Sequence, residues 1–387
     1  MTGLDGGGFQ NVVAIAPGSS DTVLSGGDVS GINRSNDLGV SYQISNVGLT
    51  SGGALKIAAL AYHPSIPGKV YAAAGHEGNV GGLFVSTDDG RSWTLRSEIP
   101  QFSGNNNTGV AGLPAPHPRS TGNLIAIDGA SGTIWVATFK DGVMRSTDDG
   151  ATWATLGLAG KYLRSLALDP ADPNVAYAAA YGDGVWKTVS ASGSGSFGKL
   201  AGSPEGPEEL VVLAGRVFVA AGPAGIHESR DGGSTWAAVN RGTIPLGGET
   251  VWTSIAGYKS GGSAVLFVGS MNPQKFRGSP NFATIFKSTD GGASWAPVTG
   301  RSEVHYEVLG GKGPWWLSSV SAQAMVDKHS AITGAIAIDP SNHENVFIAG
   351  RGGLWRSTNG GGDWYPSVGG MGVTVNDRVL ADPRVPG

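Results

Sequence analysis

Short apolar runs of four to six residues, bounded by turn-forming residues, recur along the whole chain. Runs of this length that are rich in Val, Ile and aromatic residues predict strands and not helices. The clearest set occupies residues 70–74, 134–137, 175–179, 217–220, 265–268 and 346–349. Each run has further short runs around it, as in the first repeat at 12–16, 22–25, 31–34 and 41–44. The pattern therefore predicts a unit of four strands that is repeated along the chain.

An eight-residue phrase, Ser-x-Asp-x-Gly-x-Ser/Thr-Trp, marks the same point of each repeat. It is complete at 86–93, 146–153, 229–236 and 288–295. A variant at 357–364 has Asn359 in the acid position, a copy at 35–42 ends in Tyr42, and a degenerate copy without the acid spans 188–197. The copies are spaced by roughly 40–70 residues, which is typical of propeller blades of ~40–50 residues with insertions.

The chemistry of this phrase predicts a hairpin turn. Asp and Ser side chains accept hydrogen bonds from nearby backbone amides and hold a tight bend. Glycine supplies the positive φ that the bend requires, and the closing Trp begins the next strand and packs between neighbouring repeats. A calcium loop or a set of catalytic acids is the alternative, but repetition at every repeat favours an architectural role.

These observations predict an all-β fold, a seven-bladed β-propeller with four-stranded blades in one domain, 1–387. The expected blades span about 9–45, 55–97, 120–156, 162–200, 208–239, 251–298 and 331–368. Residues 373–387 resemble the first strand and turn of one more blade. We expect them either to close the ring or to begin a further domain.

Composition supports this fold and narrows the partners. The chain has 65 glycines and 11 tryptophans, but only 14% charged residues, as expected for a turn-rich β protein. A net charge of −4 favours neither nucleic acid nor an anionic membrane as a partner. The absence of cysteine excludes disulfides and thiolate metal sites, and no apolar run approaches the ~18 residues of a membrane span. The amino terminus lacks the basic and apolar segments of a signal peptide, which leaves secretion open.

Candidate chemistry lies on the face opposite the turn phrases, where the loops vary between repeats. Asp28 is the candidate catalytic residue, because the glycines around it leave its carboxylate accessible to a large ligand. The alternative is that Asp28 caps a glycine turn. Asp141, Asp183 and Glu249 are other acids in comparable loops.

Aromatic and polar loop residues are candidates for substrate binding. Trp252, Trp315 and Trp316 lie outside the turn phrases in glycine-rich loops, where exposed aromatic faces stack on sugar rings. His76, Lys140 and Arg351 follow second strands and are assigned to the same face, with solvated loop residues as the alternative. The acids and histidines of residues 303–329 match no metal motif, so neither a metal nor a cofactor is expected.

Three stretches carry a family resemblance. Gly6-Gly7-Gly8-Phe9, the run Gly27-Asp28-Val29-Ser30-Gly31 with Ile32-Asn33-Arg34, and residues 118–128 continuing to Ser146 are similar to glycoside hydrolase family 74. Those enzymes cleave xyloglucan, and their first blade reads Gly-Gly-Gly and then Thr-Asp-Val-Gly-Gly-x-Tyr-Arg. The turn phrase, an Asp-box (BNR) repeat, also occurs in sialidases, sortilin-like receptors and photosystem assembly factors.

The resemblance implies an extracellular, inverting hydrolase of a β-glucan such as xyloglucan, with Asp28 as the general base. In that family the general acid comes from a second propeller that faces the first across a cleft. Ser30 and Asn33 depart from the Gly and Tyr of the family pattern. The implied partners are therefore a polysaccharide or oligosaccharide, and a second propeller domain or chain facing the loops.

A non-catalytic propeller that binds glycan or protein through the same face is the alternative. A sialidase is disfavoured, because the chain lacks the Arg-Ile-Pro opening and an arginine triad. A polysaccharide lyase using His76, Tyr162, or His305 with Tyr306 has no motif in its favour.

Overall fold

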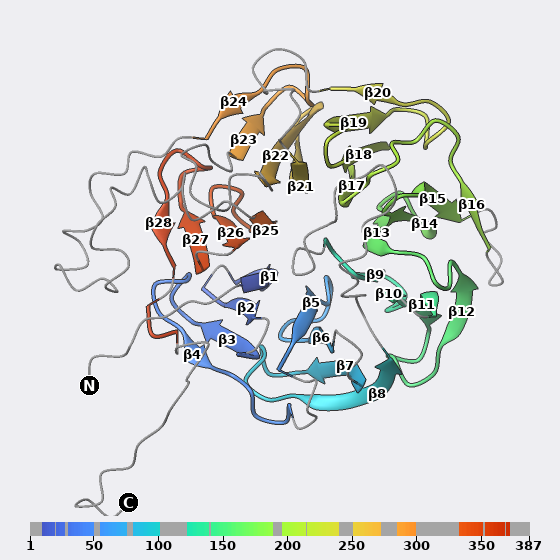
Figure 1. Ribbon diagram of the computed structural model, residues 1–387. Helices are drawn as coiled ribbons and strands as arrows, with labels where there is room; N and C mark the ends of the chain where they lie inside the picture. The colour runs from blue at the N-terminus through green and yellow to red at the C-terminus, as the bar shows by residue number, and fades with distance from the viewer. Residues whose placement is uncertain are drawn as a thin grey trace, which may run out of the picture.

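Each repeat folds as an antiparallel sheet in which consecutive strands pair, and the seven sheets surround a central axis as blades (Figure 1). The computed structural model describes residues 10–19, 21–27, 30–49, 55–75, 80–100, 122–138, 141–188, 196–213, 215–239, 251–271, 285–298, 333–350, 353–367 and 369–371. Within these residues there are strands and turns but no helices. The predicted all-β, seven-bladed propeller is confirmed.

The first four sheets contain β1 (Gln10–Ile15), β2 (Val23–Gly27), β3 (Ile32–Ser35) and β4 (Gln43–Ile44); β5 (Ile57–Tyr62), β6 (Val70–Ala74), β7 (Val80–Ser86) and β8 (Thr94–Pro100); β9 (Ile125–Ile127), β10 (Ile134–Thr138), β11 (Gly142–Ser146) and β12 (Ala154–Gly157); and β13 (Leu163–Asp169), β14 (Asp172–Ala180), β15 (Gly184–Thr188) and β16 (Phe197–Lys199). The last three contain β17 (Glu209–Leu213), β18 (Arg216–Ala220), β19 (Ile226–Ser229) and β20 (Ala237–Ala238); β21 (Val251–Ser260), β22 (Ser263–Met271), β23 (Ile285–Ser288) and β24 (Ala296–Pro297); and β25 (Thr333–Ile338), β26 (Val346–Gly350), β27 (Gly353–Ser357) and β28 (Tyr365–Pro366).

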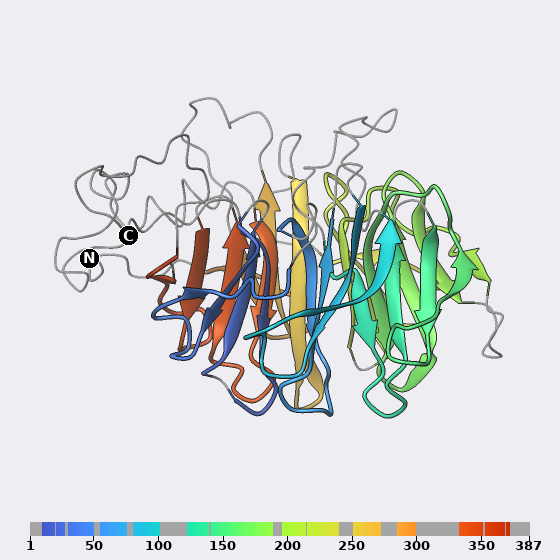
Figure 2. The same cartoon turned by 90° about the horizontal axis from the view of Figure 1, so that it is seen from below.

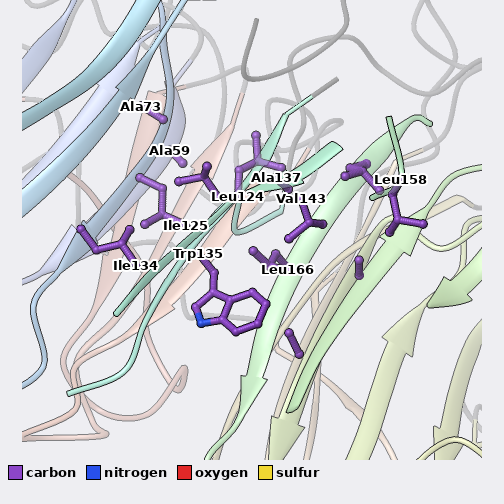
Figure 3. Close-up of a cluster of buried hydrophobic side chains, with 14 of the residues drawn as sticks. Ala59, Ala73, Leu124, Ile125, Ile134, Trp135, Ala137, Val143, Leu158 and Leu166 are labelled. Atoms are coloured by element: carbon purple, nitrogen blue, oxygen red, sulfur yellow. The ribbon is translucent and has the colours of Figure 1, made fainter. Parts of the chain in front are cut away.

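The second strand of each blade is sandwiched within its sheet and between neighbouring blades. All residues of β6 and β10 are buried, which explains why their sequences are continuous apolar runs without alternation. Small residues let adjacent sheets approach each other closely. Ala59 and Ala73 of the second blade, for example, pack in one cluster with Trp135 and Leu166 of the next two blades (Figure 3).

Each described turn phrase is closed by its own side chains. In the phrase of the second blade, the Ser86 hydroxyl donates to Asp88 Oδ1 at 2.7 Å and accepts the Gly90 N–H at 2.8 Å. The other end is held by Ser92, whose N–H and hydroxyl donate to the Asp88 carboxylate at 3.0 and 2.7 Å. Partial desolvation opposes ionisation, but these hydrogen bonds together lower the pKa of Asp88 to about 2. The predicted hairpin role of the phrase is confirmed.

The turns require a left-handed backbone at two successive residues, of which the sequence predicts only the glycine. The pairs are Leu38–Gly39, Asp89–Gly90, Asp149–Gly150, Gly232–Gly233, Gly291–Gly292 and Gly360–Gly361. The first member is a glycine in three copies only, so the other three hold a side chain in a conformation that L-residues rarely adopt.

The closing aromatic residue of a phrase joins its blade to the preceding one, as predicted. Trp93 Nε1 donates to Ser45 O at 2.9 Å, and Trp295 Nε1 donates to Val239 O at 2.8 Å. In both cases the acceptor belongs to the outer edge of the blade before. The phrase therefore forms a turn and also fixes the spacing between blades.

At six turns a cation from the preceding blade also caps the turn, which the sequence analysis did not predict. It donates to the carbonyl of the residue just before the turn glycine. The pairs are Arg34–Asp89 (2.6 Å), Arg96–Asp149 (2.9 Å), Lys187–Gly232 (3.1 Å), Arg216–Gly291 (2.8 Å), Lys287–Gly360 (2.7 Å) and Arg356–Leu38 (2.8 Å). Because the last pair runs from blade seven to blade one, the same contact closes the ring.

Residues 367–371 supply further ring-closing contacts. Ser367 Oγ donates to Gly39 O at 2.6 Å, and Tyr42 N donates to Gly369 O at 2.6 Å. Met371 is buried in a cluster that contains side chains of both blades. All four strands described in the first sheet come from residues 10–44. The strand expected within 373–387 lies outside the described residues.

Candidate functional site

The two faces of the ring differ in what they carry. The first residue of each first strand pairs with the end of the second strand, as in Gln10 with Gly27 and Val251 with Met271. The entry to a blade and the loop after its second strand therefore share one face, which we call the loop face. The turn phrases join third and fourth strands and lie at the opposite face, because the strands run between the two faces (Figure 2).

Most of the predicted site residues belong to loop-face connections. Asp28, His76, Lys140, Trp315, Trp316 and Arg351 lie outside the described residues, as do Glu249, His305 and Tyr306. Their assignments stay predictions. The described residues on either side of these positions nevertheless show where each loop joins its blade. We call these flanking residues the frame of the loop.

The frame of the Asp28 loop is held at both ends. Gly27 N donates to Gly31 O at 2.9 Å and closes the loop at its base. The Asn46 side chain then holds the returning strand, because its Nδ2 donates to Ser30 O and its Oδ1 accepts Ile32 N, both at 2.8 Å. Gly31 has a φ of 75°, and a Cβ there would lie 2.2 Å from Asn46 Oδ1. The glycine is therefore required both by the backbone and by the space.

Buried polar side chains lie directly beneath this loop. Gln10 is fully buried at the start of β1, and its Oε1 accepts a hydrogen bond of 2.6 Å from the Ser25 hydroxyl. Asn11 donates through Nδ2 to Ile57 O of the second blade at 3.0 Å, so the entry of the first blade is fixed to its neighbour. The residues on either side of Asp28 are therefore held in place by hydrogen bonds within the first blade and to the second.

The prediction that Trp252 stacks on a sugar ring is wrong. Its side chain is only 1% exposed, at the start of β21, and its ring meets Phe286 edge-on with centroids 5.7 Å apart. Its backbone also pairs with Gly222 of the fifth blade. Stacking on a sugar needs an exposed ring face, so Trp252 is a packing residue between blades five and six.

A buried ion pair at the loop face joins the fourth and fifth blades. Arg164 of β13 contacts Glu208 Oε2 through Nε at 2.8 Å and Nη2 at 2.7 Å. Their side chains are 5% and 0% exposed, so both charges are removed from water. Such a pair contributes little net stability, but losing one partner leaves the other charge buried and uncompensated.

The adjacent Glu209 is a buried carboxyl that favours its neutral form. Its Oε2 accepts Ile255 N of the sixth blade at 2.9 Å. A Cβ on Gly122 would lie 2.9 Å from Glu209 Cγ, so the side chain also touches the third blade. Burial raises the pKa of Glu209 to about 8, against the opposing effect of its backbone hydrogen bonds and of Arg164. Only 3% of the Glu209 surface is exposed, so the residue contacts neighbouring blades and is inaccessible to a polymer.

Among the described loop acids, Asp183 has an environment that disfavours a general acid. Asp183 lies between Lys161 and Lys199, with Lys199 Nζ at 3.1 Å. Partial burial opposes ionisation, but the hydrogen bonds and charges of both lysines lower the pKa of Asp183 below its usual value. A general acid needs a raised pKa, so these contacts do not suit Asp183 to that role. The backbone N–H of Asp141 donates to Thr138 Oγ1 at 3.1 Å in the turn after β10.

The sequence analysis did not single out Gln10, Arg164, Glu208 or Glu209. The available signal was two consecutive glutamates at the entry to an apolar strand, followed by Leu210. Within the described residues, no group of three or more His, Asp or Glu side chains is placed to hold a metal. The same residues include no helix suited to crossing a membrane.

Comparisons with known proteins extend the picture. No protein-family model matches the chain. A xyloglucanase of Hypocrea jecorina is 25% identical over 344 residues, which are 85% of this chain and 35% of that enzyme. A xyloglucanase of Acetivibrio thermocellus is 26% identical over 355 residues, covering 75% of this chain and 39% of that enzyme. The chain thus spans little more than a third of the length of these relatives.

Solved structures show the same ring. The GH74 xyloglucanase of Xanthomonas campestris superposes with a TM-score of 0.72 at 19% identity, over 96% of this chain and 55% of that one. YCF48 bound to D1 peptide superposes with a TM-score of 0.57 at 15% identity, over 92% of this chain and 94% of that one. Both show the fold alone.

The ring and its loop face define a β-propeller with Asp-box turns. Within that class, the sequence relatives are xyloglucanases, and structural neighbours include enzymes of glycoside hydrolase family 74. The chain is a β-propeller that is similar to the xyloglucanases of glycoside hydrolase family 74, as the resemblance predicted.

Proposed function

We propose that this chain is the base-bearing propeller of an inverting glycoside hydrolase that acts on a β-glucan such as xyloglucan. The observation that supports this most is its similarity to a xyloglucanase along 85% of its length. In this proposal Asp28 is the general base. The fixed frame of its loop suits that role, because a base must be held in one place relative to the attacked carbon.

Inversion requires two carboxyl groups on opposite sides of the glycosidic bond. The base activates a water on one face of the sugar while an acid protonates the leaving oxygen, with roughly 6.5–9.5 Å between the carboxyls. Asp183 is unsuited to the acid role because its pKa is lowered, and Glu209 because it is buried. In this proposal the acid comes from a second propeller that faces the loop face, in the same polypeptide or in another, as the resemblance implies.

In this proposal, residues of the loop-face loops bind the sugar. Trp315 and Trp316 supply stacking faces in place of Trp252, and His76, Lys140 and Arg351 supply polar contacts. A polysaccharide is too large to enter a cell, so we propose that the protein acts extracellularly. No metal or cofactor takes part in these steps.

An activated substrate tests the contribution of the base without requiring the general acid. A 2,4-dinitrophenyl β-glycoside of a xyloglucan oligosaccharide has a leaving group that needs no protonation, so the chain alone is expected to release dinitrophenolate. Asp28→Asn is expected to lower that rate at least ~100-fold, the usual contribution of a general base. Asp141→Asn, in the equivalent loop of the third blade, is the matched control and should keep the wild-type rate.

The enzyme hypothesis and the hypothesis of a non-catalytic binding module predict different results with polymeric xyloglucan. Adding a facing propeller from a related enzyme is expected to enable release of reducing ends. A wild-type chain that binds glycan but releases no dinitrophenolate would identify a binding module and refute the enzyme.

A further inference from the structure

The turn phrase of the seventh blade differs from the complete phrases at two linked positions. The phrase of the sixth blade, 288–295, reads Ser-Thr-Asp-Gly-Gly-Ala-Ser-Trp, whereas 357–364 reads Ser-Thr-Asn-Gly-Gly-Gly-Asp-Trp. The acid position therefore holds Asn359, and an acid, Asp363, stands where the four complete phrases have Ser or Thr. Asn359 and Gly360 also form the only Asn-Gly pair in the sequence.

The two changes together keep the shape of the turn but reverse one hydrogen bond. In the sixth blade, the Ser294 hydroxyl donates to the Asp290 carboxylate. In the seventh, Asn359 Nδ2 donates to Asp363 Oδ2 at 2.8 Å. Asn359 Oδ1 accepts the Asp363 N–H at 2.8 Å and the Ser357 hydroxyl at 2.9 Å. This turn therefore depends on an amide at position 359, because residue 359 supplies the donor.

An amide before a glycine is open to a reaction that the acids of the other turns resist. Asp231 and Asp290 also precede glycines. Hydrogen bonds, mainly from the hydroxyl four residues later, lower the pKa of Asp231 to about 2 and that of Asp290 below its usual value. Both are therefore ionised at neutral pH, and a carboxylate is a poor electrophile. The neutral amide of Asn359 lacks this protection.

We propose that Asn359 is a site of deamidation, and that the reaction removes the donor that holds the turn of the seventh blade. The Gly360 nitrogen forms a bond to Asn359 Cγ and loses its proton to the solvent. The Cγ–Nδ2 bond breaks, and the amide nitrogen takes up a proton and leaves as ammonia. Water then opens the cyclic imide at either of its two carbonyl carbons. One product is aspartate, and the other is isoaspartate, in which the main chain runs through the side-chain carbon.

The contacts of the folded turn control when this reaction occurs. The Gly360 N–H donates to Glu344 O at 2.8 Å, so the attacking nitrogen is engaged while the turn is closed. Asn359 itself is exposed, so breaking a few hydrogen bonds frees both reacting groups without unfolding the blade. Ser357 is the buried anchor of the turn, since its hydroxyl also accepts the Gly361 N–H at 2.8 Å.

Each product changes the turn in its own way. Aspartate at position 359 places a second carboxylate against Asp363, across a contact that is now 2.8 Å between Nδ2 and Oδ2, and like charges so close repel. Isoaspartate adds one atom to the main chain just before Gly360, whose carbonyl accepts Lys287 Nζ of the sixth blade at 2.7 Å. Deamidation therefore loosens the seventh turn, and its isoaspartate form also disturbs the contact with the sixth blade.

Peptide mapping of the full chain after incubation at neutral pH tests the reaction. Asn359 is expected to gain the mass of an acid in place of an amide before other asparagines do, with isoaspartate among the products. Ser357→Ala removes the anchor of the turn and is expected to raise the rate about tenfold. Ser288→Ala, the same change in the sixth turn, is the matched control and should leave the rate at Asn359 unchanged. An Asn359 that stays an amide in both the wild type and Ser357→Ala would overturn the proposal.

Asn359→Asp tests the consequence of the reaction without the extra main-chain atom. At neutral pH this variant is expected to melt about 2 °C below the wild type, because two carboxylates then face each other. Adding Asp363→Ser should restore the melting temperature, since the pair completes the phrase found in the sixth blade. An Asn359→Asp variant as stable as the wild type, or a double variant no more stable than Asn359→Asp, would contradict the role of the amide donor.

Discussion

The acids of the turn phrases and two glutamates of the loop face, Glu208 and Glu209, have opposite environments. Asp148 and Asp231 are held by short side-chain and backbone hydrogen bonds that lower the pKa of each to about 2. Glu209 is buried among three blades, and burial raises its pKa to about 8. Glu208 is fully buried against Arg164. A carboxyl group is therefore ionised and exposed at Asp148 and Asp231, but enclosed at Glu208 and Glu209.

This difference distinguishes the acids that form the repeated turns from the acids that join particular blades. The turn acids repeat because every blade needs the same hairpin, and each satisfies its own turn. Glu208 and Glu209 have no counterpart in that repeat, and they connect blades four, five and six instead of closing a local turn. Four predictions, from the largest expected effect to the smallest, test this contrast.

Arg164→Leu is expected to cost about 3–5 kcal/mol of unfolding free energy, because Glu208 would remain buried without its counter-charge. Urea unfolding measures the loss. The double variant Arg164→Leu/Glu208→Leu should recover most of it, since an apolar pair replaces the ion pair. A single variant as stable as the wild type would show that water reaches Glu208.

Ser146→Ala tests a turn phrase. The buried hydroxyl accepts Gly150 N and donates to Asp148 Oδ1, both at 2.8 Å, and its loss leaves that N–H unpaired. We expect a loss of about 2 kcal/mol in urea unfolding. Thr152→Ala, at the exposed end of the same turn, is the control and should lose less. Equal losses would mean that burial does not determine the contribution.

Glu209→Gln tests the raised pKa of the loop-face acid. The folded pKa of about 8 lies above the ordinary 4.5, so the folded state binds more protons than the unfolded state between these values. Wild-type stability should therefore fall as the pH rises from about 4.5 to about 8. The amide does not titrate, so the variant should melt about 2–4 °C above wild type at pH 8.

At pH 4 the two proteins should melt together, because the glutamate is then protonated in both states. Parallel melting curves at every pH would indicate that Glu209 is ionised in the folded protein.

Asp89→Gly should give a small gain. Asp89 holds a φ of 58°, a position that other copies of the turn fill with glycine. Relief of that conformation, offset in part by the greater backbone entropy of unfolded glycine, should add about 0.5 kcal/mol in urea unfolding. The neighbouring Asp88→Gly should lose stability, because Asp88 holds the turn. A loss at Asp89 would mean that its side chain contributes more than the strain costs.

The fold could be predicted because it depends on repetition. Seven copies of one turn and one apolar run define the blades, and the second strands fall close to the predicted runs, as in β6 and β10. The cations that cap the turns were not predicted. Arg34, Lys187, Lys287 and Arg356 each stand just before the first residue of a turn phrase, a signal that the sequence contains. Arg96 and Arg216 lie at other positions of their blades, so that signal marks only part of the set.

The site was predictable only in part. A family-like motif identifies Asp28, which lies outside the described residues, so its role stays a prediction. Trp252 shows the limit of that approach, because a tryptophan beside a glycine-rich loop can face the next blade as readily as the solvent. Gln10 and Ser25 meet only through strand pairing across the sheet, which composition does not reveal.

The most direct test of the central claim is the stereochemistry of the first product. Proton NMR during cleavage of the dinitrophenyl β-glycoside resolves the two anomers before mutarotation mixes them. A base at Asp28 that directs water to the opposite face of the sugar predicts the α-anomer first, and none from Asp28→Asn. A β-anomer released first, or wild-type cleavage by Asp28→Asn, would contradict the account.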